Sequence, residues 1–124
     1  MLTLPIKKKW FDMIKSGEKK EEYREIKPYW TKRLGFISDS KEETIYQVNK
    51  NILLRNGYSK NSPILKCYVR IKKGYGKPEW GAIPNKEYYV LRILSVEEIE
   101  NENDRDNLWF KRYDYMCIKV RNRS

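Results

Sequence analysis

The chain has 124 residues, of which 27 are Lys or Arg, 17 are Asp or Glu and none is His, so its formal net charge is +10. The absence of His excludes Ser-His and Cys-His hydrolases and His-ligated zinc enzymes, and we expect neither a metal nor a cofactor. No apolar run approaches the roughly 20 residues of a transmembrane helix and no secretory signal opens the chain, so we expect a cytoplasmic protein without membrane contact.

The N-terminal segment predicts a strand followed by a helix. Apolar residues alternate with others over 2–6, which indicates a short strand with Pro5 near its edge or end. Trp10, Phe11 and Ile14 then recur at helical spacing. Gly17 is typical of a helix C-terminus, so we expect the helix to end there and to cover one end of a sheet with its apolar face.

A second strand is expected over 19–26, where charge types alternate instead of apolar and polar residues. One face would carry Lys20, Glu22 and Arg24, and the other Lys19, Glu21, Tyr23 and Glu25. A strand of this kind buries little apolar surface unless one charged row lines a cleft. Tyr23 is expected to be a core or rim aromatic and not a base-stacking surface.

The rest of the chain alternates short strands with loops. A helical turn is expected over 28–34, strands over 52–54, 64–71, 87–93 and 115–120, and loops over 35–44, 56–63 and 72–84. Five to six short strands with one clear helix predict an α+β fold, a small and mostly antiparallel β-barrel with one or two flanking helices. The length suits a single domain over residues 1–124.

The basic residues are unevenly distributed. No acidic residue lies between Thr44 and Pro78, whereas that stretch contains Lys50, Arg55, Lys60, Lys66, Arg70, Lys72, Lys73 and Lys77. Such a positive field attracts polyanions and favours binding of nucleic acids or nucleotides. The alternative is a solvated lysine-rich surface that reflects an AT-rich genome. Cys67 and Cys117 both lie in alternating apolar runs and are expected to be buried free thiols.

The segment from Gly17 to Arg24 reads GEKKEEYR and matches the pattern GxKxxExR. Gly17 permits a tight turn that can direct Lys19 across the mouth of a barrel, and Arg24 presents a planar fork suited to phosphate or a base edge. Glu22 can hold these cations in register, accept a hydrogen bond from a base or transfer a proton. The alternative is a surface ladder of ion pairs, each contributing about 0–1 kcal/mol.

This pattern resembles the signature of ASCH domains, and the chain is similar to the small members of phages and low-GC Gram-positive bacteria. Further similar blocks are 4–7, 10–17, 55–58, 74–76, 79–82 and 88–91, in that order. The resemblance implies a PUA-like barrel and a cleft, lined by the signature residues, that binds RNA or a modified nucleoside or nucleotide. One branch of the family removes the acetyl group of N4-acetylcytidine with the signature Lys, a Thr three residues later and a distant Glu. Here Lys19 is present, but Glu22 replaces the Thr.

A second group of candidate residues lies in the later loops. Glycines at 57, 74, 76 and 81 permit close approach of the backbone to a ligand, and Tyr75 or Trp80 could stack on an unpaired base. The alternative is that these aromatic residues, flanked by glycines, only cap one end of the barrel. Phosphate contacts are expected from Lys72, Lys73 and Lys77. The complete set of expected nucleic-acid-binding residues is Lys19, Glu22, Arg24, Asn56, Tyr58, Lys72, Lys73, Tyr75, Lys77 and Trp80.

Three functions are compatible with these features. The first is a binding module for single-stranded RNA or a modified nucleotide. The second is an enzyme, either a nucleoside amidohydrolase or a metal-independent ribonuclease, with Lys19 and Glu22 as catalytic residues. The third is a protein-interaction factor, such as a phage-encoded inhibitor, whose charge occupies an acidic partner surface.

Overall fold

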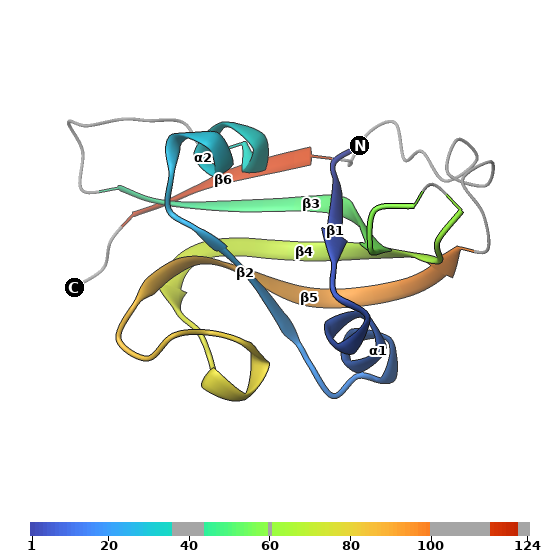
Figure 1. Ribbon diagram of the computed structural model, residues 1–124. Coiled ribbons are helices and arrows are strands. Elements are labelled where there is room, and N and C mark those ends of the chain that lie inside the picture. Colours follow the sequence, from blue (N-terminus) through green and yellow to red (C-terminus); the bar gives the residue numbers. More distant parts are fainter. Residues whose placement is uncertain (36–43, 60, 100–114, 122–124) are drawn as a thin grey trace.

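The chain folds around one curled β-sheet with a helix near each of its two edge strands (Figure 1). The computed structural model describes residues 1–35, 44–59, 61–99 and 115–121, and of 44–46 and 115–121 the backbone alone. Its elements are β1 (Thr3–Ile6), α1 (Lys8–Ser16), β2 (Glu21–Glu25), α2 (Pro28–Leu34), β3 (Thr44–Asn56), β4 (Ile64–Tyr75), the 3-10 helix η1 (Pro78–Trp80), β5 (Glu87–Ile99) and β6 (Tyr115–Arg121).

The strand order is β1-β3-β4-β5-β2, and β6 joins the same edge of β3 as β1 does, but at the other end of that strand. Only the β1–β3 pair is parallel, whereas the other neighbours run antiparallel. In Figure 1, β1 passes in front of β3 and β4, and β2 passes in front of β5, which shows the curl of the sheet. The expected α+β class is confirmed: in the described part of the chain, six mostly antiparallel strands form a half-closed barrel with two flanking helices.

Strands β3 and β4 are longer than the sequence pattern predicts. The expected strand over 52–54 extends back to Thr44, because residues 44–50 pair with β6. The expected loop over 72–84 is wrong in its first part, since Lys72–Tyr75 pair with Val90–Glu87 of β5. Ladder hydrogen bonds satisfy the backbone of these polar segments, so the strands continue where apolar alternation stops.

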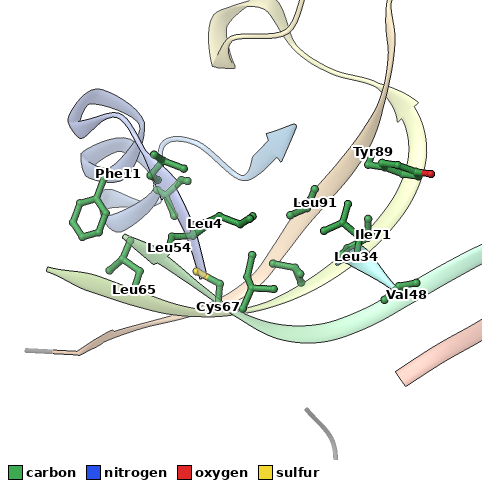
Figure 2. Packing of buried hydrophobic residues seen from close by; sticks show 14 residues of the cluster. Leu4, Phe11, Leu34, Val48, Leu54, Leu65, Cys67, Ile71, Tyr89 and Leu91 are labelled. Atoms are coloured by element: carbon green, nitrogen blue, oxygen red, sulfur yellow. The ribbon is translucent and has the colours of Figure 1, made fainter. Parts of the chain in front are cut away.

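The core lies on the inner face of the curled sheet. Its fully buried members come from both helices and four strands: Leu4, Phe11, Ile14, Leu34, Val48, Ile52, Leu54, Leu65, Cys67, Val69, Ile71, Tyr89 and Leu91. Figure 2 shows these side chains gathered against the sheet. Each fully buried aliphatic side chain contributes about 1.5–3 kcal/mol to folding. The thiol of Cys67 is free and buried as predicted, whereas the side chain of Cys117 lies outside the described residues.

Helix α1 determines how the chain enters β2. It ends at Ser16 as predicted, because Gly17 adopts a left-handed conformation with φ of 85° and donates its N–H to the carbonyl of Ile14. The backbone N–H of Lys19 then donates to the carbonyl of Met13 at 2.9 Å. This turn holds Lys19 beside the helix instead of in the strand. In the residues described, no helix combines the length and apolar character needed to cross a membrane.

Candidate functional site

Strand β2 presents a charged face to the inside of the sheet. Glu22 pairs with Leu91 and Arg24 with Tyr89, two core residues of β5, so the two charged side chains share the face of the core. Tyr23 points to the opposite face and is buried in a second cluster with Trp80, Ala82 and Tyr88. Glu22 and Arg24, two members of the charged row expected to line a cleft, therefore face the core, and Tyr23 is a core aromatic as expected.

Lys19 is placed differently from the sequence interpretation. The strand begins only at Glu21, so side-chain alternation does not reach Lys19, and this residue lies on the side of Glu22. Its Nζ donates a hydrogen bond of 2.7 Å to the carbonyl of Trp80 and lies 3.6 Å from Glu22 Oε1. It also lies 4.1 Å from the centre of the Trp10 ring, a cation–π geometry. Burial lowers the pKa of Lys19, and the neighbouring Glu22 carboxylate partly offsets that effect.

Lys19, Glu22 and Arg24 form a largely buried ionic triad, in which Arg24 is the most exposed member. Oε1 of Glu22 accepts the Tyr23 N–H at 3.0 Å and lies 3.4 Å from Arg24 Nη1. Arg24 Nη1 also donates to the Tyr23 carbonyl at 2.7 Å, and its guanidinium lies 5.3 Å from the centre of the Trp30 ring. The side chains of Lys19, Glu22 and Arg24 are 1%, 8% and 16% exposed, which excludes the alternative of a solvent-exposed ladder.

The second carboxylate oxygen, Oε2 of Glu22, is buried and has no hydrogen-bond partner in the described part of the chain. Leaving a buried polar atom without a partner costs about 1–3 kcal/mol, and more for a charged group. Such an atom in a native structure calls for a functional explanation. A ligand that donates an N–H or O–H to Oε2 would supply the missing hydrogen bond.

Two adjoining cavities meet at Glu22 and Arg24. The first, of about 320 Å³, is walled mainly by aromatic and charged residues: Trp10, Glu22, Tyr23, Arg24, Glu25, Lys27, Trp30, Trp80, Gly81 and Tyr88. The second, of about 470 Å³, lies between the edge strands and is lined by Pro5, Ile6, Lys7, Lys8, Trp10, Glu22, Arg24, Gly57 and Tyr58. Both volumes are within the usual size of small-ligand sites.

The aromatic wall of the first cavity is held in place by hydrogen bonds across the second cluster. The Tyr23 hydroxyl donates to Glu21 and accepts the Lys77 N–H, both at 2.9 Å, and burial raises the pKa of Tyr23 well above its usual range. The rings of Tyr23 and Tyr88 lie 5.6 Å apart, and the Tyr88 hydroxyl accepts the Ile83 N–H. These contacts fasten the segment around η1 to β2 and β5.

The structure brings together some of the expected nucleic-acid-binding residues. Glu22, Arg24 and Trp80 line the first cavity, and Tyr58 lines the second, where its side chain is 87% exposed. Lys19 lies beneath the first cavity, in contact with three residues of its wall: Trp10, Glu22 and Trp80.

The other expected residues lie away from this centre. Lys72, Lys73 and Tyr75 are exposed on β4, Asn56 ends β3, and none of these four lines either cavity. Lys77 is intermediate, because it lines neither cavity but its Nζ lies 4.5 Å from the centre of the Trp80 ring. The single basic cleft predicted from the sequence is thus smaller than expected, since Lys72 and Lys73, which are adjacent and lie on opposite faces of β4, are both exposed and line neither cavity.

Sequence reasoning missed several residues of the two cavities, among them Lys7, Lys8, Trp10, Trp30 and Tyr88. The helical spacing of Trp10 with Phe11 and Ile14 assigned it to a core face, but Trp10 is only half-buried and faces Lys19. A usable signal was the position of Trp10 and Trp30 on the two helices that flank the signature strand.

No group of three or more His, Cys, Asp or Glu side chains suited to a metal ion occurs among the residues that the structure describes. Comparison of the chain with models of protein families, with curated proteins and with solved structures gives no match.

Proposed function

We propose that this protein is a binding module that holds one unpaired base of single-stranded RNA, or a modified nucleotide, in the cavities beside β2. One observation carries the proposal: a buried ionic group, Glu22 with Arg24, opens into a cavity whose other walls are largely aromatic. Aromatic faces stack on bases with little dependence on sequence, and buried polar groups fix the orientation of the base.

The charge of the chain supports the same proposal. With a formal net charge of +10, the protein attracts polyanions, and steered association is strongly dependent on salt. Exposed cations such as Lys72 and Lys73 lie outside the cavities, where they can contact phosphates on either side of a bound base. The similarity of the segment Gly17–Arg24 to the ASCH signature agrees with a ligand of this class.

Binding of short single-stranded RNA and DNA to the wild type and to Arg24→Ala tests this function. Arg33→Ala is the matched control, because Arg33 also lies over an aromatic ring, at 3.4 Å from the centre of Tyr29, but on the exposed helix α2. We expect Arg24→Ala to weaken RNA binding at least tenfold and Arg33→Ala to change it less than twofold. Equal effects of the two variants would contradict the assignment of the cavity, and absence of any RNA or nucleotide binding would favour a protein-interaction factor.

A second candidate is an amidohydrolase or ribonuclease, and the Lys19–Glu22 pair favours it. The two groups lie 3.6 Å apart, and burial lowers the pKa of Lys19, which favours the neutral amine that proton abstraction or nucleophilic attack requires. However, Lys19 Nζ is engaged by the Trp80 carbonyl, and Lys19 lines neither cavity. Product analysis of every bound RNA and acylated nucleoside separates the candidates, because only an enzyme converts its ligand.

A further inference from the structure

The second cavity lies at the N-terminus of α1, and this helix end is built to receive an anion. No side chain caps it, its first turn contains no acidic residue, and Lys7, Lys8 and Lys9 follow one another there. The first N–H groups of a helix have no partner within the helix and carry partial positive charge. Lys7 and Lys8 line the cavity, and Lys8 also bridges Asp12 at 2.6 Å in the next turn.

An independent observation indicates that the same cavity holds a ligand. The side chain of Glu22 is only 8% exposed and lines both cavities. Its Oε2 has no hydrogen-bond partner among the described residues. A bare phosphate offers no favourable contact to a carboxylate. The ligand must therefore carry an N–H or O–H donor for Glu22 in addition to any anionic group for the helix end.

Arg24 provides the complementary donor beside this acceptor. The guanidinium has five N–H donors, and one of those on Nη1 donates a hydrogen bond to the Tyr23 carbonyl. The Arg24 side chain lines both cavities. Glu22 and Arg24 lie two residues apart on one face of β2, so an acceptor and a donor stand side by side. This arrangement fits a base edge on which an N–H lies next to a carbonyl oxygen or a ring nitrogen.

We propose, on the basis of the function proposed above, that the ligand is a nucleoside phosphate that occupies both cavities at once. Its base lies among Trp10, Trp30 and Trp80 and donates an N–H to Glu22 Oε2. Its phosphate lies in the neighbouring cavity, at the N-terminus of α1 beside Lys7 and Lys8. The phosphate subsite distinguishes a nucleotide-binding site from one that recognises only a nucleoside or a base.

Tryptophan fluorescence titration with the four ribonucleosides and their 5′-monophosphates tests this assignment. We expect the wild type to bind at least one monophosphate tenfold or more tightly than its nucleoside. Lys7→Gln/Lys8→Gln should remove that difference while leaving nucleoside affinity unchanged. Lys20→Gln/Lys32→Gln removes the same charge from exposed positions outside both cavities and should preserve it. Glu22→Gln should weaken nucleoside and monophosphate tenfold or more in parallel, which keeps the phosphate contribution intact.

The outcomes separate this inference from the proposed function. Equal affinity of the wild type for nucleosides and monophosphates, or equal losses in the two lysine variants, would overturn the phosphate subsite, even if RNA still binds. Unchanged nucleoside affinity in Glu22→Gln would overturn the base contact. Failure of every nucleoside, monophosphate and oligoribonucleotide to bind would overturn both proposals. Thermal unfolding of each variant verifies that it is folded.

Discussion

Lys19 Nζ lies 2.7 Å from the carbonyl oxygen of Trp80, a residue 61 positions later in the chain. This contact joins the turn after α1 to the end of η1. It therefore holds Trp80, which lines the first cavity, close to the start of β2. Glu22, 3.6 Å away, supplies the opposite charge. A buried ion pair of this kind stabilises little in total, but loss of Lys19 would leave the buried Glu22 carboxylate with only part of its compensating charge.

We therefore predict that Lys19→Met lowers the free energy of unfolding by about 3 kcal/mol. The substitution removes the donor to the Trp80 carbonyl and leaves Glu22 with Arg24 as its remaining cation. Lys20→Met is the matched control, because its exposed neighbouring side chain has no comparable contact in the described structure and should change stability by less than about 0.5 kcal/mol. Urea denaturation measures both, and equal stabilities would contradict a structural role for Lys19.

Gly76 lies where the strand β4 leaves the sheet and packs directly on the second cluster. A Cβ at this position would lie 2.5 Å from the Tyr23 ring and 2.6 Å from the Ala82 Cβ. We predict that Gly76→Ala destabilises the fold by about 1–3 kcal/mol, since Tyr23 must move from its contacts. Gly74→Ala is the control, because its Cβ would make an ordinary 3.7 Å contact with Val90. Urea denaturation of the two variants should separate them clearly.

The sequence predicts where most elements occur, because periodicity and turn residues are local signals. Gly17 determines the end of α1, and alternation of Leu65, Cys67, Val69 and Ile71 determines the central part of β4. The extension of β4 through Lys72 to Tyr75 is not local. It depends on pairing with β5, from which a loop separates it in the chain. The paired segment of β4 itself has no apolar alternation that would identify it as a strand.

The candidate site is only partly predictable for the same reason. The pattern from Gly17 to Arg24 identifies the ionic triad, since its members are close in sequence. Trp10 and Trp30 become cavity walls only through the curl of the sheet and the placement of α1 and α2 around β2. Lys72 and Lys73 carry the expected charge, but they lie on β4 and line neither cavity.

Alkaline pH should destabilise the protein through Cys67. Burial raises the pKa of this thiol to about 12, from an ordinary value of about 9.0. Between these values the unfolded state loses its thiol proton while the folded state retains it, so stability falls as pH rises. We predict that between pH 8 and pH 10 the wild type loses about 1.4 kcal/mol more than Cys67→Ala does. Urea denaturation at the two pH values measures this difference, and parallel losses in both proteins would contradict the burial effect.

Trp30 combines two tasks in the proposed binding of an unpaired base. Its ring lines the first cavity and also lies 5.3 Å from the guanidinium of Arg24, which it holds beside Glu22. Because loss of a stacking aromatic costs about 1–3 kcal/mol per base, we predict that Trp30→Leu weakens single-stranded RNA binding about 5- to 150-fold. Tyr29→Leu is the control, since Tyr29 packs edge-on against Trp30 but is 53% exposed and lines neither cavity. Fluorescence anisotropy with a labelled oligoribonucleotide measures both, and a loss in Tyr29→Leu as large as in Trp30→Leu would show that α2 contributes through its fold and not through a stacking face.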